Sequence, residues 1–183
     1  QGDSEKLDYL TYKAKANFRY VLSSAHNIEA NIIYMQDAPS FQSAFVSPRT
    51  RNDVTPGISA EKVFGADASY NIRIGDFKAR ISGYYTAFND QSKVISYYDD
   101  VAATFSNFAM SGINKTHYGV ELAASIPIYE GLALKGALSW GEYKYSNNPH
   151  YVQIQDNSAK VINEGKVYWK GKKVESTPQT AAN

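Results

Sequence analysis

Apolar and polar residues alternate along much of the chain with a period of two. The segment "TYKAKANFRYVL" (11–22) sets Tyr12 and Phe18 on one face of an extended chain, with Lys13 and Arg19 on the other. Such a period is that of a β-strand with one dry and one wet face. The dry face packs either against a protein core or against lipid. A core indicates a soluble protein and lipid a membrane protein, so the function depends on what covers this face.

The same alternation recurs five times. It covers segments 27–35, 63–73, 77–88, 117–126 and 132–141. The last residues, "PQTAAN" (178–183), look like the start of a further strand. No segment of useful length has a helical period, so the sequence predicts an all-β, antiparallel fold of about six strands plus a stub.

Charged residues avoid the dry faces of these segments. The wet faces carry Lys13, Lys15, Arg19, Glu29, Asp67, Arg73, Lys78, Arg80, Glu121 and Lys135, and the dry faces carry none. A soluble sandwich tolerates an occasional edge lysine on such a face. On a lipid-facing strand, however, a central Lys or Arg costs about 2–4 kcal/mol. This pattern favours lipid.

Short and long connections alternate strictly. The turns "SSAH", "IGD" and "PIYEG" join the strand pairs, whereas segments 36–60, 89–116 and 142–176 separate them. Soluble domains favour connections of about 4–6 residues, but outer-membrane barrels have short periplasmic turns and long extracellular loops. "KVISYY" and "GKVYWKGKKV" inside the long segments are themselves strand-like, so we expect strands to continue past the membrane.

Aromatic residues on the dry faces gather near the strand ends. We assign six of them to the lipid interface: Tyr12, Tyr20, Tyr34, Tyr85, Tyr118 and Trp140. Aromatic girdles at both interfaces are typical of transmembrane barrels. About six strands do not close a barrel, whose smallest usual size is about eight. We therefore interpret residues 1–183 as a partial outer-membrane β-barrel domain, a segment of a larger antiparallel transmembrane barrel.

Composition narrows the function classes. The 183 residues hold 19 Lys+Arg against 18 Asp+Glu, a balance that argues against a dedicated nucleic-acid partner. There is no cysteine, and His26, His117 and His150 share no metal-ligand spacing. No phosphate loop, nucleophile elbow or hydrolase-like acid pair stands out. We expect no enzyme activity, no metal and no cofactor.

Ligand contacts, if they fall in this chain, are expected in the long segments. Arg49 and Arg51, two apart in an extended stretch, could clamp a phosphate or carboxylate, or fold the loop through local salt bridges. Tyr97 and Tyr98 are further candidates. Trp169 lies among lysines and could stack a sugar or nucleobase or contact lipopolysaccharide phosphates, unless it only forms a loop hairpin with solvated lysines.

Several motifs resemble the later barrel strands of TonB-dependent outer-membrane receptors. They are "TPGISAEKV" followed by "YYT" and "NDQ" within 41–94, "YGVEL" within 111–128, and "LSWGEYKYSNNP" and "ESTPQTAAN" further on. The resemblance covers most of the chain, most firmly 41–183, and says nothing about the substrate.

The resemblance implies a barrel of about 22 strands in the bacterial outer membrane, around a plug, with energy delivered through TonB. The plug domain and the TonB-binding segment would lie outside this chain. The implied function is energy-coupled uptake of a nutrient ligand, with membrane lipid and lipopolysaccharide as surroundings. Two alternatives stay open: a passive porin-like barrel, and a soluble all-β adhesion or carbohydrate-binding module.

Overall fold

The chain forms one antiparallel sheet of nine strands. The computed structural model describes residues 3, 5–47, 52–101, 103–156 and 160–182. The elements are β1 (Tyr12–Val21), β2 (His26–Asp37), α1 (Phe41–Ala44), β3 (Glu61–Ile74), β4 (Phe77–Asp99), β5 (Thr104–Tyr129), β6 (Leu132–Tyr145), β7 (His150–Gln155), β8 (Val161–Lys166) and β9 (Thr180–Ala182). The prediction of an all-β antiparallel fold is confirmed.

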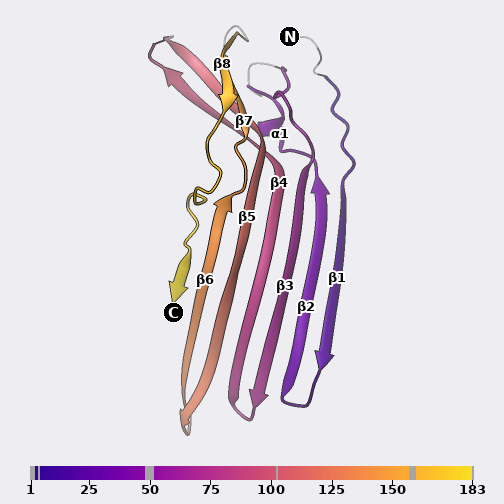
Figure 1. The fold of residues 1–183 in the computed structure, drawn as a ribbon, viewed down its shortest axis with the longest axis vertical. Helices are drawn as coiled ribbons and strands as arrows, with labels where there is room; N and C mark the ends of the chain where they lie inside the picture. Colours follow the sequence, from indigo (N-terminus) through magenta and orange to yellow (C-terminus); the bar gives the residue numbers. More distant parts are fainter. Residues whose placement is uncertain (1–2, 4, 48–51, 102, 157–159, 183) are drawn as a thin grey trace.

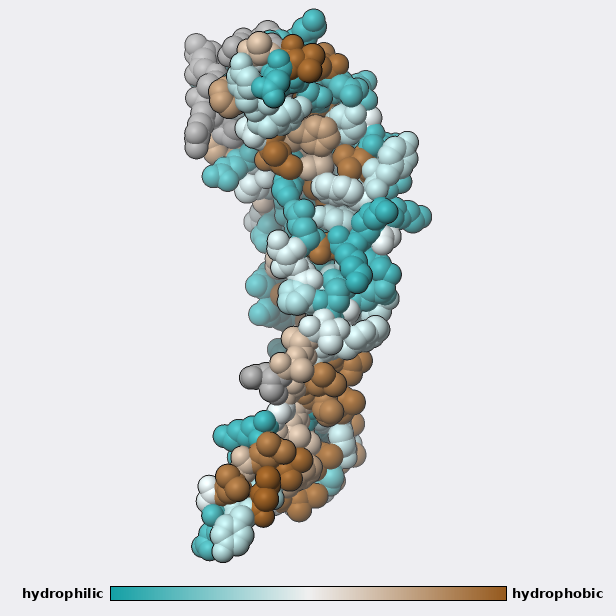
Figure 2. All heavy atoms as spheres, turned by 90° about the vertical axis from the view of Figure 1, so that its left-hand side faces the viewer, coloured by the Kyte–Doolittle hydropathy of each residue, from teal (hydrophilic) through white to brown (hydrophobic). Residues whose placement is uncertain are grey.

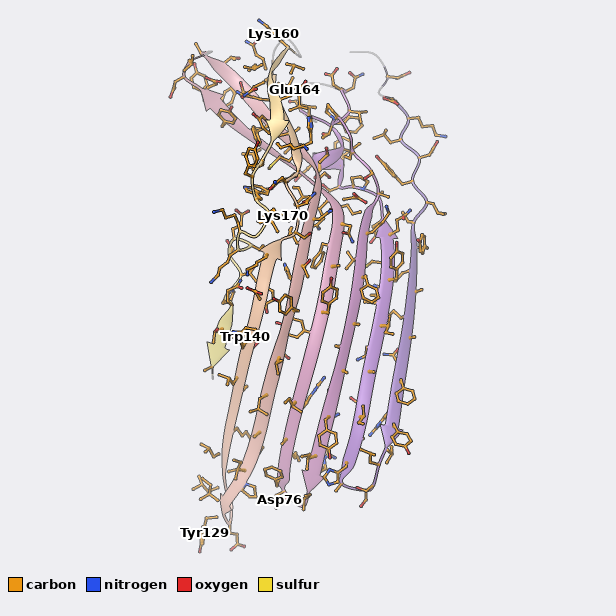
Figure 3. All side chains as sticks on the ribbon, viewed as in Figure 1. Asp76, Tyr129, Trp140, Lys160, Glu164 and Lys170 are labelled. Atoms are coloured by element: carbon orange, nitrogen blue, oxygen red, sulfur yellow. The ribbon has the colours of Figure 1, made fainter. Side chains whose placement is uncertain are left out.

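Strands β1 to β6 lie side by side in chain order, and β9 follows β6 (Figure 1). The tight turns are all at the lower end, where Figure 3 labels Asp76 and Tyr129, while α1, β7 and β8 are at the upper end. Among the described residues β1 pairs only with β2, so this sheet is open and not closed as a barrel. None of the described residues belongs to a helix with the length and hydropathy of a membrane span.

The strand register brings the predicted dry faces together on one side of the sheet. One row of directly paired residues crosses all six long strands: Phe18, Ala30, Ala68, Gly83, Val120 and Trp140. Because directly paired residues in antiparallel strands share a face, the six predicted faces form a single surface. We call this surface the apolar face and the opposite one the polar face.

No second layer covers the apolar face in the described part of the chain. Phe18 is 60% exposed, Leu134 59% and Trp140 53%. Figure 2 shows hydrophobic side chains gathered over the lower part of the molecule and hydrophilic ones above them. The buried apolar clusters are small and use residues of β5, of the end of β6 and of the upper elements: Val46, Ala109, Val152 and Ile154 in one, and Met110, Ile113 and Tyr145 in the other.

The structure tests two expectations about the long segments. The expected strand continuation through "KVISYY" is confirmed, because β4 continues to Asp99, and since β5 begins at Thr104 most of segment 89–116 is a long hairpin. The prediction that "GKVYWKGKKV" is strand-like is wrong beyond Lys166, where β8 ends. An isolated bridge between Lys144 and Lys173 is the remaining β-pairing of this segment. There the chain turns at Gly171, whose φ is 79°, and bonds to the edge of β6. The predicted final strand start is confirmed as β9.

Two irregularities separate the lower sheet from the upper hairpin. The β4–β5 register shifts between Phe88 and Gln91 and again between Gln91 and Lys93. Within this stretch Asp90 has a φ of 59° and, on β5, Gly112 has a φ of 67°. These are β-bulges, which add residues to a strand and bend it. The upper hairpin therefore follows a different direction from the lower sheet.

Two facing glycines make room for a tyrosine on the polar face. Gly119 pairs with Gly141, and the Tyr84 side chain lies over both of them and hydrogen-bonds the Tyr143 hydroxyl. A Cβ added at Gly119 would lie 2.4 Å from the carbonyl oxygen of Trp140 and 2.6 Å from the Tyr84 hydroxyl. The strands therefore pack here only without side chains at these two positions.

We predict that Gly119→Ala destabilises the sheet. The added methyl group meets backbone atoms that cannot move aside, and overpacking of this kind costs about 1–3 kcal/mol. Urea unfolding of the folded chain measures the loss. Gly83→Ala is the matched control, because a Cβ there meets nothing closer than 3.9 Å. Equal stability of the two variants would contradict the packing described here.

Candidate functional site

A pocket of about 510 Å³ lies at the upper end of the sheet, between the β4–β5–β6 strands and the segment after β8. We call it the upper pocket. Its lining residues are Gln91, Ser92, Lys93, Ile113, Lys115, His117, Tyr145, Trp169, Val174, Glu175, Ser176 and Thr177. Its floor is therefore made by strands and its outer wall by segment 169–177.

The β4 bulge brings Gln91 and Ser92 to this pocket. The backbone N–H of Asp90 donates to the Asn114 side-chain oxygen at 2.9 Å, and the N–H of Asn114 donates to that of Asn147 at 3.0 Å. Asn and Asp tolerate a left-handed backbone better than most residues. The bulge is thus held by β5 and, through Asn114, by the segment after β6, so the residues just after it have a fixed position.

The outer wall is bound to the edge of β6 by backbone hydrogen bonds. The N–H of Gly171 donates to the Tyr145 carbonyl at 2.8 Å, and that of Val174 donates to the Tyr143 carbonyl at 2.9 Å. The Trp169 ring lies against the Tyr145 ring, with centroids 4.5 Å apart. Figure 3 shows Lys170, in the same segment, beside the upper end of β6. The wall is therefore preorganised by the strand that it borders.

Three polar atoms in this pocket are shielded from solvent and have no hydrogen-bond partner among the described residues. They are Gln91 Oε1, Ser92 Oγ and His117 Nε2. The His117 ring lies between those of Phe88 and Tyr143, with centroid distances of 5.0 and 4.7 Å. A buried polar group without a partner costs about 1–3 kcal/mol. Such groups in one pocket suit the binding of a polar ligand.

The charges of the upper pocket are unevenly paired. Lys93 Nζ lies 2.7 Å from Glu175 Oε1, and this hydrogen bond lowers the pKa of the Glu175 carboxyl group. Burial, and secondarily the charge of Lys93, lower the pKa of the half-buried Lys115. The Lys115 ammonium forms no ion pair with any residue that the structure describes. It is therefore the cation that can receive an anionic group.

A second hollow, of about 670 Å³, lies on the polar face near the tight turns. It is lined by basic residues of four strands, Arg19, Arg73, Lys78, Arg80 and Lys135, together with the acid Glu29. Arg19 Nε lies 3.5 Å from Glu29 Oε1, and Asn31 donates to Asp67 at 2.8 Å nearby. We call it the basic hollow. Its cations are exposed, so they remain hydrated.

The aromatic residues assigned to the lipid interface all lie on the apolar face. Tyr12 stacks on Tyr34 with centroids 5.8 Å apart, Phe64 lies 6.4 Å from Tyr85, and Tyr85 pairs directly with Tyr118. Because Tyr34 also pairs with Phe64, these rings form one row across β1 to β5, which we call the aromatic row. Trp140 lies next to it on β6, and Tyr20 lies at the other end of β1.

The predicted ligand-contact residues that the structure describes do not form one site. Trp169 lines the upper pocket, whereas Tyr97 and Tyr98 lie on the upper part of β4 outside it, Tyr98 edge-on to Phe105. Arg49 and Arg51 fall outside the described residues. Sequence reasoning missed Gln91, Ser92, Lys115 and Glu175, and considered His117 only as a histidine without metal-ligand spacing. No local signal marks these residues, because the bulge and the final segment bring them together.

The described residues contain no group of three or more His, Cys, Asp or Glu side chains that could hold a metal ion. Comparison of the chain with protein-family models, curated proteins and solved structures finds no match.

We predict that Glu175→Gln loosens the outer wall at neutral pH. Because the folded-state pKa of Glu175 is lowered, its contact with Lys93 stabilises the wall above the ordinary carboxyl pKa. That contribution disappears as the pH falls through the lowered value. The protection factor of the Val174 amide should fall a few-fold at pH 7, as for exposed ion pairs of about 0.2–1 kcal/mol.

Hydrogen exchange of the folded chain measures this protection. At a pH below both pKa values the variant and the unchanged chain should be equally protected. Glu164→Gln, an exposed acid on β8, is the matched control and should change nothing at either pH. A pH-independent loss of protection would contradict a role for the ion pair.

Proposed function

We propose that this chain forms part of the wall of a bacterial outer-membrane β-barrel, that of a TonB-dependent receptor which imports a nutrient ligand. The observation that carries the proposal is the uncovered apolar face, continuous from β1 to β6. A soluble protein rarely exposes a large apolar patch unless a partner or a membrane covers it. Lipid covers such a face without any further layer of protein.

The height of the apolar face fits a membrane. Tyr12 and Tyr20 on β1 are eight positions apart, as are Phe77 and Tyr85 on β4. At about 3.3 Å per residue each pair spans about 26 Å along the strand. The apolar band of an outer-membrane barrel is about 25 Å tall and is bordered by aromatic girdles. The aromatic row then corresponds to the outer girdle.

Charged side chains begin immediately above the aromatic row. Lys62 Nζ lies 3.1 Å from Asp90 Oδ2, and Glu142 contacts both Lys144 and the Tyr118 hydroxyl. Below the row, the apolar face carries no charge down to the turns. This abrupt change supports a boundary between hydrocarbon and headgroups at the level of Tyr118. Lys62 and Lys144 are well placed to meet lipopolysaccharide phosphates there.

The two ends of the sheet support an orientation. Short turns at one end and long segments at the other match the periplasmic and extracellular sides of outer-membrane barrels. The upper pocket, Tyr97 and Tyr98 then lie outside, and the polar face with its basic hollow lines the lumen. Energy coupling through TonB and the presence of a plug are supported only by the sequence motifs described above.

Two other functions are weighed against this one. A passive porin-like barrel shares every feature of the strands, and dependence of uptake on the proton gradient separates it from a receptor. A soluble adhesion or carbohydrate-binding module needs a second layer over the apolar face. The described residues supply none, which favours the membrane reading.

We predict a depth-dependent cost of arginine on the apolar face. Leu122→Arg, at mid-height, should destabilise the bilayer-inserted chain by about 2–4 kcal/mol, because the charge enters hydrocarbon. Trp140→Arg, near the aromatic row, should cost less, since arginine reaches the interface from there. Urea titrations of the chain folded into liposomes measure both.

Asn17→Arg, on the exposed polar face of β1, is the matched control. Its cross-strand partner is the uncharged Asn31, so its arginine should cost little in the barrel. Equal costs at Leu122 and Trp140, or a folded and water-soluble chain that does not associate with bilayers, would overturn the membrane proposal and leave the soluble module.

A further inference from the structure

We propose that the upper pocket binds an acidic saccharide, a hydroxyl-rich ring that carries one carboxylate. The proposal assigns a ligand class to the transport function, and it rests on that function for its position on the outer side of the membrane. Three features of the pocket favour this class of ligand: an aromatic surface, polar atoms without a hydrogen-bond partner, and a lysine without an ion pair.

Trp169 supplies the apolar surface. Its indole is half-buried, lines the pocket and is held against Tyr145, so its orientation is fixed before a ligand arrives. The C–H face of a pyranose ring is flat and apolar, and it packs on aromatic rings. Backbone hydrogen bonds from this segment to β6 keep the indole in place.

The unpartnered atoms supply the hydroxyl recognition. Gln91 Oε1 only accepts hydrogen bonds, whereas Ser92 Oγ donates and accepts, and His117 Nε2 does either according to its tautomer. A partner for Gln91 must therefore donate. With the unpaired Lys115 in the same pocket, a ligand ammonium is disfavoured, and a neutral donor such as a hydroxyl fits this position. Side-chain rotation of Gln91 and Ser92 turns their oxygens toward the ligand.

Lys115 supplies the preference for an acid. Lys93 is already paired with Glu175 at 2.7 Å, while Lys115 is half-buried on β5 and forms no ion pair among the described residues, with Glu175 and Glu61 acting on it only at longer range. A carboxylate beside its ammonium replaces the water that burial has removed. The basic hollow also attracts anions, but its cations are exposed and it has no aromatic wall, so it does not select sugars.

The size of the pocket agrees with this ligand. A volume of about 510 Å³ lies within the range of small-molecule sites and accommodates one or two sugar rings. Both walls are fixed, one by the bulge at Asp90 and the other by the edge of β6. Binding therefore requires side-chain rotations without a rearrangement of the backbone.

The test uses Trp169 as its own reporter. The chain contains two tryptophans, so Trp140→Phe leaves Trp169 as the only one. The detergent-folded variant is titrated with D-glucuronate, with D-glucose as the neutral sugar and acetate as the bare carboxylate. We expect a saturable fluorescence change with glucuronate, at least tenfold weaker binding of glucose, and no saturation with acetate over the same range.

Variants separate the contributions. Lys115→Met should reduce glucuronate affinity at least tenfold, to the level of glucose, and Lys115→Gln provides the same loss of charge if the first variant does not fold. Lys172→Met, on the same segment but outside the pocket, is the matched control and should change nothing. Gln91→Ala should weaken glucuronate and glucose alike.

Three results would overturn the inference: no binding of glucuronate to the folded chain, unchanged affinity in both Lys115 variants, or acetate binding as tightly as glucuronate. Bilayer insertion, measured separately, distinguishes this failure from that of the proposed function. If the chain inserts into bilayers but does not bind glucuronate, only the saccharide proposal is wrong. If it binds glucuronate but does not insert, only the membrane proposal is wrong.

Discussion

Cross-strand register is the constraint on which this molecule depends. Each long strand has one apolar and one polar side, so a slip of one residue between two strands would exchange the faces of one of them. The row from Phe18 through Gly83 to Trp140 shows that no such exchange occurs across β1 to β6. Tight turns help to maintain this register, with Gly75 and Gly131 at positive φ in two of them.

The sequence predicts this lower sheet well because the determinants are local. Alternation sets the two faces of a strand, and short turns force neighbours to be antiparallel, so the dry side of segment 11–22 follows from its own residues. The length of β4 and β5 was harder to predict. Asp90 and Gly112 interrupt the alternation, and an interrupted pattern resembles a connection even where pairing continues.

The upper pocket was beyond sequence reasoning for a different reason. Lys93 meets Glu175, and Tyr145 meets Trp169, across long stretches of chain whose path depends on the edge of β6. Trp169 could be predicted as a ligand contact because a tryptophan among lysines is a recognisable sequence pattern. Gln91 and Ser92, by contrast, are ordinary polar residues whose significance is that nothing satisfies them. That property exists only in three dimensions.

The bulged stretch around Asp90 also affects how such a protein can change. A residue inserted into a regular strand exchanges the two faces of the strand beyond it, so variation in the upper hairpin would ordinarily disturb the apolar face. Here the extra residues are already accommodated at one point, held by Asn114 and Asn147. Mutations that lengthen or shorten the hairpin above can be absorbed at this joint. The upper hairpin can therefore vary in length while the apolar face below keeps its alignment.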